Sequence, residues 1–265
     1  MSSIIRPTSA QMTRRLIVLA CAIFAIVIAY AQMLMGWGQT PAEFAADSDA
    51  TLKVAGYTFA IWGVIYLGVL VYAARQALPA TGESELLRRL GWPSVLAFLG
   101  IGWWILAAAF DWEIGTIVLI FGSLLVLLVP LLLNARTIRA LPRSSRERWM
   151  VMWPLALLAG WLGIAAPVNL LTVLTGNGDL PTVLSPTVWA LIAVLAVTAK
   201  ALAVTWVLRT PAFALPISWG LLGVFVAEME RNPVLAVGAV AASGVTLVGA
   251  FILTFRLKAP IEKPN

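Results

Sequence analysis

The 265-residue chain contains no histidine, and it has a single cysteine, Cys21. The absence of histidine excludes imidazole acid–base catalysis, serine–histidine and cysteine–histidine nucleophile pairs, and histidine-ligated haem or zinc. A lone cysteine excludes an intramolecular disulfide and a metal site built from clustered cysteines. Few hydrolytic or redox mechanisms remain, so we expect that the protein is not an enzyme.

Charge is also scarce. Charged residues make up 11% of the chain, whereas hydrophobic residues make up 61% and the mean hydropathy is +0.94. Soluble domains carry about 25% charged residues, so this chain has too few charges to cover a globule in water. The composition predicts an integral membrane protein.

Apolar runs of about membrane-spanning length, roughly 20 residues, recur eight times. They cover residues 16–36, 57–77, 92–110, 114–134, 150–173, 186–208, 213–229 and 233–255. A chain in hydrocarbon must satisfy its own backbone polar groups, and runs this long and this continuously apolar predict helices rather than barrel strands. The expected fold class is all-α, a polytopic transmembrane bundle of about eight helices.

Lysine and arginine gather in alternate connections between these runs. Fifteen of the 18 basic residues lie in one set, namely Arg6, Arg14, Arg15, Arg75, Arg88, Arg89, Arg136, Arg139, Arg143, Arg146, Arg148, Arg209, Arg256, Lys258 and Lys263. The other connections hold only Lys53 and Arg231. The positive-inside rule therefore predicts that both termini are cytoplasmic, in a membrane that we expect to be a bacterial cytoplasmic membrane.

Two basic features of the sequence, the loop 135–148 and the single residue Lys200, each have more than one interpretation. The arginine-rich loop 135–148 has the composition of an RNA- or lipid-binding patch, but its position beside a span accounts for it as a positive-inside signal. We therefore expect no nucleic-acid partner. Lys200 is the one basic residue inside a span. We expect its stem to snorkel toward the cytoplasmic end, with a buried pairing or a role in an ion path as the alternative.

Twelve tryptophans occur in the chain, and seven lie near span ends, where such rings form an interfacial belt. The deeper ones are Trp62, Trp103, Trp104, Trp161 and Trp219. Each of their indole N–H groups is expected to find a hydrogen-bond partner in a dry environment. We expect Trp62, Trp103 and Trp104 to lie at a similar depth, roughly 8 Å below the outer surface. On the fifth span, Trp161 is expected near the middle of the membrane and Asn169 in its outer third.

Two spans carry a stripe of side chains on one helical face, with spacings of i, i+3, i+7 and i, i+4, i+8. The first stripe is Phe59, Trp62 and Tyr66, and the second is Trp161, Ala165 and Asn169. We expect these stripes to wall one shared aromatic cavity in the outer half of the bundle. Ordinary packing against neighbouring helices is the alternative.

Two motifs on these stripes resemble those of the TspO/MBR family, the tryptophan-rich sensory proteins and translocator proteins. FAIWGVIY, residues 59–66, is similar to the family's F-x-x-V-W-T-x-L-Y signature, and WLGIAAPVN, residues 161–169, is similar to its fifth-helix W-x-x-F-A-x-x-L-N. The resemblance covers roughly residues 10–173. We therefore expect a TspO/MBR-like five-helix bundle over residues 1–173 and a three-helix membrane extension over residues 174–265.

The resemblance implies an integral membrane receptor or carrier with a sensory or regulatory role. Its ligand would be flat and hydrophobic, either a porphyrin- or haem-type tetrapyrrole or a sterol-like molecule. The implied ligand-binding residues are Phe59, Trp62, Tyr66, Trp104, Trp161, Ala165 and Asn169. Trp62 and Trp104 would stack on the ring system, Asn169 would hydrogen-bond a polar substituent, and loop 37–56 would be the lid. No cofactor or metal is required, and without histidine a haem would bind through its flat face.

Two other functions remain open at this stage. One is a transporter or permease component. It is suggested by the eight spans, by Lys200 and by a short sequence similarity between residues 60–69 and residues 217–226, which could be an internal repeat. Close helix packing through Gly220 and Gly223 explains this similarity more simply. A structural subunit of a larger membrane complex is the third candidate. The expected partners are the lipid bilayer and a small hydrophobic ligand, with homo-oligomer formation left open.

Overall fold

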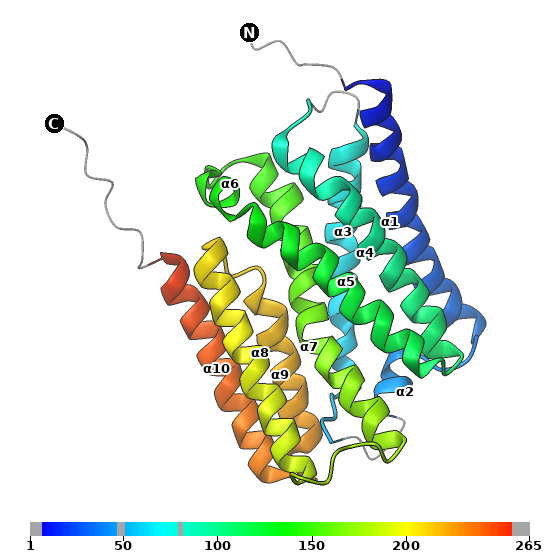
Figure 1. Ribbon diagram of the computed structural model, residues 1–265, viewed down its shortest axis with the longest axis vertical. Coiled ribbons are helices and arrows are strands. Elements are labelled where there is room, and N and C mark those ends of the chain that lie inside the picture. Colours follow the sequence, from blue (N-terminus) through cyan, green and yellow to red (C-terminus); the bar gives the residue numbers. More distant parts are fainter. Residues whose placement is uncertain (1–6, 47–50, 79–81, 256–265) are drawn as a thin grey trace, which may run out of the picture.

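The computed structural model describes residues 7–46, 51–78 and 82–255, which form helices and connecting turns without any strand (Figure 1). The long helices follow the long axis of the molecule, and α1 begins at the same end at which α10 ends. The long helices are α1 (Ser9–Met35), α3 (Ile61–Ala77), α4 (Glu85–Ala109), α5 (Glu113–Leu133), α7 (Trp153–Gly176), α8 (Pro186–Leu208), α9 (Ala214–Glu228) and α10 (Pro233–Phe255). The short elements are α2 (Pro41–Ala46), the 3-10 helix η1 (Gly56–Ala60), α6 (Ala135–Ala140) and the π-helical turn η2 (Arg148–Met152).

All eight predicted spans are helical. Within the described residues, seven helical segments are long and apolar enough to cross a membrane, so the chain is a polytopic helical membrane protein. The eighth segment, α9, has 15 residues and is shorter than the roughly 20 that a perpendicular span requires. Pro216 does not interrupt it, because a proline in the first helical turn removes no hydrogen bond that the helix needs.

Helix α7 lies at the centre of the molecule. It packs against α3 and α5 of the N-terminal bundle and against α9 of the last three helices, while α8 and α10 pack beside α9. The close approach of α7 to the start of α9 depends on Gly160, where an added Cβ would lie 2.9 Å from the carbonyl carbon of Phe213. Small residues allow such backbone contact between membrane helices, and here they join the two groups of helices.

Lys200 of α8 does not snorkel, so that prediction is wrong. Its Nζ lies 2.6 Å from the carbonyl oxygen of Gly163 on α7 and donates a hydrogen bond to it. In an α-helix this carbonyl would accept from the N–H of residue 167, but Pro167 has none. Lys200 therefore supplies from a neighbouring helix the donor that α7 lacks, which is the buried pairing expected as the alternative.

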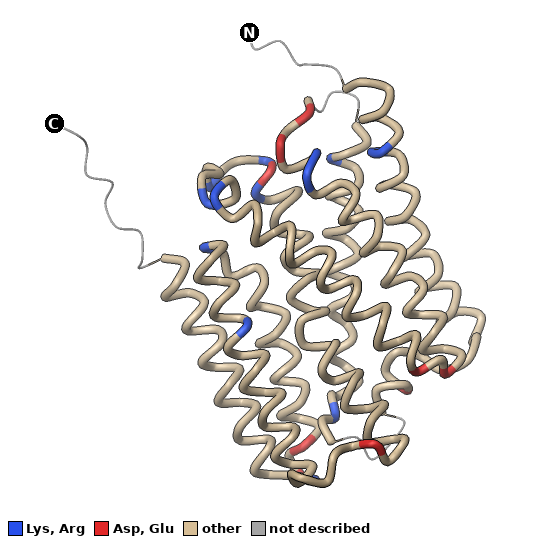
Figure 2. Tube along the Cα trace, viewed as in Figure 1, with Lys and Arg blue, Asp and Glu red and all other residues tan. Residues whose placement is uncertain are grey.

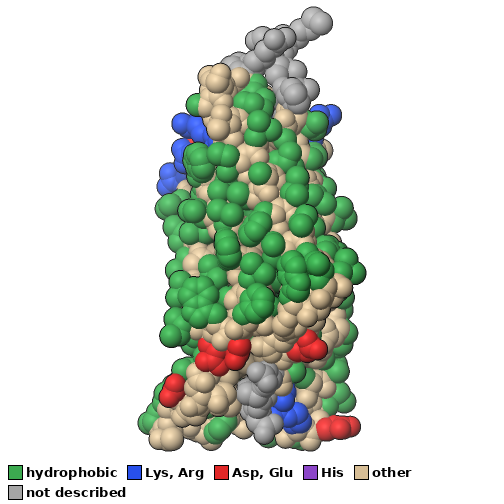
Figure 3. Space-filling view, turned by 90° about the vertical axis from the view of Figure 1, so that its right-hand side faces the viewer, with side chains coloured by type: hydrophobic (Ala, Val, Ile, Leu, Met, Phe, Trp, Pro, Cys, Tyr) green, Lys and Arg blue, Asp and Glu red, His purple; other side chains and the backbone are tan. Residues whose placement is uncertain are grey.

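Charge separates the two ends of the bundle (Figure 2). We call the end where α1 begins and α10 ends the basic end, and the opposite end the acidic end. The described acidic residues at the acidic end are Glu43, Asp111, Glu113, Asp179, Glu228 and Glu230. A band of hydrophobic side chains lies between the charged ends on the face drawn in Figure 3. The separation follows the sequence pattern, and the assignment of the basic end to the cytoplasm stays a prediction.

Glu83 fastens the beginning of α1 to the segment that precedes α4. Its two carboxylate oxygens accept hydrogen bonds of 2.7 Å from Arg14 and from Arg15. The Arg15 side chain is fully buried, and it also donates to the carbonyl of Gly82 at 3.2 Å. One carboxylate therefore pairs with two arginines that are packed inside the basic end, and its charge balances one of their two positive charges.

The Glu83 contact predicts a dependence of stability on pH. Burial alone would raise the pKa of the Glu83 carboxyl, but the hydrogen bonds and charges of Arg14 and Arg15 outweigh it and hold the pKa below 4.5. Such a group stabilises the fold fully above its unfolded-state pKa, and this contribution is lost as pH falls through the folded-state pKa. We expect the thermal unfolding midpoint in detergent to fall as pH is lowered below about 4.5.

Glu83→Gln should lower stability by about 1–2 kcal/mol at neutral pH and should remove much of that acid dependence. Glu85→Gln is the matched control, because Glu85 forms an exposed pair with Arg89 on the same helix end, and exposed pairs contribute about 0–1 kcal/mol. An acid dependence that Glu83→Gln leaves intact would show that another group causes it.

Candidate functional site

The aromatic side chains predicted from spans two, three and five lie together near the acidic end, where η1 leads into α3. The ring centroids of Phe59 and Trp161 are 6.0 Å apart, and those of Trp62 and Trp161 are 6.3 Å apart, both edge to face. Trp62 and Tyr66 stack with centroids 5.1 Å apart. These separations are the ones at which aromatic pairs attract, so the two stripes converge as expected.

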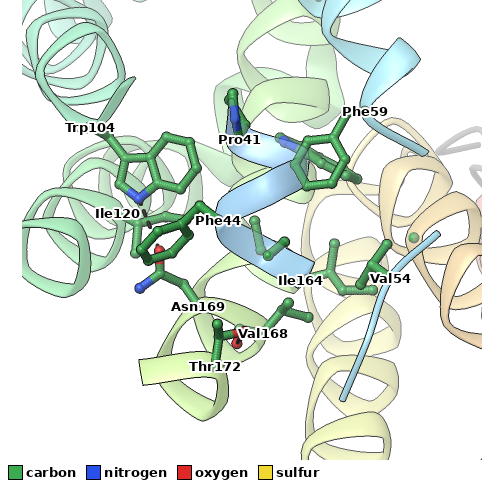
Figure 4. A pocket seen from close by; sticks show the side chains of 14 residues that line it. Pro41, Phe44, Val54, Phe59, Trp104, Ile120, Ile164, Val168, Asn169 and Thr172 are labelled. Atoms are coloured by element: carbon green, nitrogen blue, oxygen red, sulfur yellow. Dashed lines mark hydrogen bonds between the residues drawn. The ribbon is translucent and has the colours of Figure 1, made fainter. Parts of the chain in front are cut away.

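Asn169 belongs to a hydrogen-bonded network that joins three helices. Trp104 Nε1 of α4 donates to Asn169 Oδ1 of α7 at 3.0 Å (Figure 4). Asn169 Nδ2 donates to Thr116 Oγ1 of α5 at 2.9 Å, and this hydroxyl donates to the carbonyl of Glu113 at 2.6 Å. The Asn169 amide is thus already engaged, and a ligand would have to share Oδ1, which has a second lone pair.

Three cavities adjoin this cluster. The largest, which we call the ligand-sized cavity, has a volume of about 390 Å³ and lies between α1, α2, η1 and α3. It is lined by Ala29, Tyr30, Gln32, Met33, Thr40, Pro41, Ala42, Phe59, Ala60, Trp62, Gly63, Tyr66 and Ile105. A second cavity of about 40 Å³ lies beneath α2, where Trp104, Trp161, Ala165 and Asn169 face Phe44 (Figure 4). A third of about 20 Å³ lies between Trp62, Trp104 and Trp161.

The volumes divide the predicted residues into two groups. Ligand sites usually measure about 300–1,000 Å³, so only the 390 Å³ cavity has that size, and the other two have room for water at most. Phe59, Trp62 and Tyr66 line the ligand-sized cavity. Trp104 lines only the small ones, where Phe44 packs edge-on against it with ring centroids 6.1 Å apart. Among these three cavities, Trp62 and Trp104 meet only at the one of about 20 Å³, and the expectation that both stack on one ligand stays a prediction.

Among the deep indoles, Trp62 is distinguished by an N–H that is both buried and unpaired. The Trp104 N–H bonds to Asn169, and the Trp219 N–H donates to the carbonyl of Thr58 at 2.9 Å. Trp62 Nε1 is buried and has no hydrogen-bond partner within the described part of the chain. A buried donor without an acceptor costs about 1–3 kcal/mol. Trp62 therefore lines the ligand-sized cavity while its unsatisfied donor is buried within the wall.

Comparison of the sequence with models of protein families assigns the chain to a known family. The model described as TSPO-like protein matches residues 14–252. The chain belongs to the TSPO-like family. The match includes α8 and α9 and most of α10, beyond the part that the motifs cover. No curated protein and no solved structure gives a match, and the division into residues 1–173 and 174–265 stays a prediction.

In this TSPO-like chain, α1 contributes a wall that the sequence analysis missed. The rings of Tyr30 and Tyr66 both line the ligand-sized cavity and contact each other, with centroids 6.2 Å apart. Gln32 is buried, and its Nε2 donates to the carbonyls of Trp37 at 2.9 Å and Gln39 at 3.1 Å, which fixes the turn leading into α2. A tyrosine and a glutamine inside an otherwise apolar run are the signal that was available in the sequence.

The helix α9 holds the segment that follows α2, although it was expected to belong to a separate extension. The contacts are Lys53 N to Glu228 Oε1 at 2.8 Å, Ala55 N to Gly223 O at 3.0 Å, Trp219 Nε1 to Thr58 O at 2.9 Å, and an edge-on ring pair of Tyr57 and Trp219 at 5.5 Å. Residues 47–50 of the expected lid, loop 37–56, lie outside the described residues. The described end of this lid is attached to α9.

Glu228 of α9 also holds this segment by its side chain. It is the last residue of α9, is 2% exposed, and forms an ion pair with Arg231 at 3.2 Å. Its buried carboxylate accepts the backbone N–H of Lys53 and so fixes the lid. Among residues 7–46, 51–78 and 82–255, no three acidic, cysteine or histidine side chains lie close enough to hold a metal ion.

Proposed function

We propose that this TSPO-like protein is a non-enzymatic membrane receptor or carrier with a sensory or regulatory role. Its ligand is a flat hydrophobic molecule, a porphyrin- or haem-type tetrapyrrole or a sterol-like compound, held in the ligand-sized cavity. The single observation that supports this most is Trp62, which offers an aromatic face stacked on Tyr66 together with an unpaired buried N–H. With the basic end in the cytoplasm, this cavity lies in the outer half of the membrane.

The chemistry of the cavity suits a ligand that has both a π-face and a polar edge. Tyr30, Phe59, Trp62 and Tyr66 supply rings on which a planar molecule can stack. A turn of the Trp62 side chain toward the cavity would expose its buried N–H, which would then donate to an acceptor on the ligand edge, such as a porphyrin carboxylate or a sterol hydroxyl. Because the chain has no histidine, a haem would be held by its face and edge rather than by imidazole coordination.

Titration of the purified protein with protoporphyrin IX, followed by the absorbance of the porphyrin, tests this assignment. Trp62→Phe keeps a ring and loses the N–H, so we expect affinity to fall about fivefold for a hydrogen bond worth about 1 kcal/mol. Trp62→Leu also removes the stacking surface and should weaken binding by at least about tenfold. Porphyrin absorbance is the better readout, because twelve tryptophans contribute to protein fluorescence.

Trp103→Leu is the matched control. Trp103 neighbours Trp104 in the chain, but its side chain is 53% exposed on the outside of α4 and contacts Phe24. The Trp103→Leu protein should bind porphyrin with the same affinity as the unmodified protein. Equal affinity of the Trp62→Leu and unmodified proteins would place the ligand elsewhere. Absence of saturable binding for protoporphyrin IX, haem and a sterol alike would reject the receptor or carrier function and favour a structural subunit.

A further inference from the structure

A fourth cavity, far from the ligand-sized one, lies at the basic end. We call it the arginine pocket; it has a volume of about 310 Å³ and is formed where the segment from α6 to α7 meets the ends of α8 and α10. It is lined by Arg139, Arg143, Arg148, Trp149, Trp153, Arg209, Thr210, Pro211, Leu215, Phe251, Thr254 and Phe255. None of the proposed porphyrin contacts takes part in it.

Four guanidinium groups give this pocket a strong positive charge. No carboxylate occurs among the described residues that line it. Arg148 donates to the carbonyls of Leu141 at 2.7 Å and Pro142 at 3.3 Å, and Arg209 donates to the carbonyl of Leu253 at 3.1 Å. Since a guanidinium has five N–H donors, each keeps donors for a further acceptor. Backbone carbonyls fix these arginines without neutralising them.

Arg209 occupies a backbone position that usually favours glycine. It caps α8 with φ +55° and ψ +44°, the left-handed conformation that non-glycine residues rarely adopt. Its guanidinium lies 4.4 Å from the centre of the Trp206 ring, and that of Arg143 lies 5.7 Å from the Phe255 ring. Aromatic faces thus hold two of the cations in place.

The other wall of the pocket is apolar. Trp149 and Trp153 stack with centroids 5.0 Å apart, and Phe251 and Phe255 stack with centroids 5.9 Å apart. Trp149 and Phe255 are each 53% exposed, although they flank a cluster of cations. A site that combines arginines with exposed rings at the level of a membrane surface matches a molecule with an anionic head and a hydrocarbon tail.

We propose that the arginine pocket binds an anionic phospholipid. Its phosphate lies among Arg143, Arg148 and Arg209, and an acyl chain lies between the tryptophan pair and the phenylalanine pair. Arginine is suited to this role because its planar donors match phosphate geometry. Nucleic acid is the less suitable occupant, because half of the lining is hydrocarbon in contact with the bilayer. This site is independent of the porphyrin proposal.

Native mass spectrometry of the delipidated full-length protein tests the proposal. Phosphatidylglycerol should bind saturably to one site, whereas phosphatidylcholine with the same acyl chains should bind at least about tenfold more weakly. Arg143→Gln together with Arg209→Gln should weaken phosphatidylglycerol binding by at least about tenfold. Arg143→Lys with Arg209→Lys should restore part of it, since the charge is retained and the planar donors are lost.

Arg88→Gln with Arg136→Gln is the control, because it removes two exposed charges from the same end outside the pocket. It should leave phosphatidylglycerol binding unchanged. Arg143→Gln alone covers the case in which the double variant fails to fold, because the Arg143 side chain is exposed. It should still weaken binding measurably, and circular dichroism checks the fold.

Several outcomes would overturn the proposal. Equal losses in the pocket and control variants would indicate attraction to the whole basic end rather than to a site. Equal binding of phosphatidylcholine would remove the role of the arginines. Competition by inorganic phosphate at the same concentration as the lipid would indicate an anion site without the acyl chain, and displacement of the lipid by an oligoribonucleotide would indicate nucleic acid.

Discussion

Gly223→Ala is expected to weaken protoporphyrin IX binding by about tenfold or more, although Gly223 lines none of the three cavities. A Cβ at this position of α9 would lie 2.9 Å from Thr58 Cγ2 and 3.0 Å from Thr58 Cβ, and it would overlap Thr58 Oγ1. Thr58 is fully buried within η1, and its Oγ1, Cγ2 and Cβ would all lie too close to the added Cβ. Rotation of the threonine side chain therefore does not relieve the overlap, and α9 and η1 must separate.

That separation matters because η1 positions the proposed ligand contacts. The bonds from Ala55 N–H to the Gly223 carbonyl and from the Trp219 indole to the Thr58 carbonyl would lengthen or break. Phe59 belongs to η1, and α3 with Trp62 begins directly after it. A displaced η1 therefore changes the floor of the ligand-sized cavity. The last helices would act on the ligand site through this contact.

Two variants separate this effect from general damage. Gly244→Ala on α10 should bind porphyrin normally, because no atom lies within 4 Å of the added Cβ. Thr58→Ala in the Gly223→Ala background removes Oγ1 and Cγ2 and should recover most of the affinity, measured beside the thermal unfolding midpoint. Unchanged binding in Gly223→Ala, or no recovery in the double variant, would show that η1 and the ligand site are not coupled through α9.

The helices and the two aromatic stripes could be predicted, because both follow from local rules. A bilayer requires long apolar helices, so run lengths alone locate the spans. Helical periodicity places Phe59, Trp62 and Tyr66 on one face whatever surrounds them. The prediction that Gly220 and Gly223 allow close helix packing is confirmed. An added Cβ would overlap Ile164 at Gly220 and Thr58 at Gly223.

The contact partners of individual side chains could not be predicted, because they depend on which helix lies opposite each helical face. Depth along the span put Trp62 and Trp104 at one level, but only the packed bundle shows that Phe44 of α2 lies against Trp104. The same limit applies to Glu228, whose partner is a backbone N–H 175 residues away in the chain. Spacing describes a helix and leaves its neighbours undetermined.

Lys200→Met is expected to lower the free energy of unfolding by about 1–3 kcal/mol, because it leaves the Gly163 carbonyl without a donor inside the membrane. Methionine is unbranched and apolar, so the substitution keeps most of the packing and removes the ammonium group. The measurement is denaturant unfolding in mixed micelles, followed by tryptophan fluorescence. Leu195→Met is the control, since Leu195 is 67% exposed on the same helix and should be neutral.

Pro167→Ala makes the test specific, because alanine restores the N–H that α7 can direct to the Gly163 carbonyl. In that background Lys200→Met should cost little, or even stabilise, since an unpaired buried lysine is removed. The double-mutant cycle should therefore give a coupling of about 1–2 kcal/mol. Additive losses would mean that Lys200 does not replace the missing bond of Pro167. If Lys200→Met also abolished ligand movement across a proteoliposome membrane, the result would favour the transporter hypothesis. Lys200 would then have a role in transport in addition to its role in helix packing.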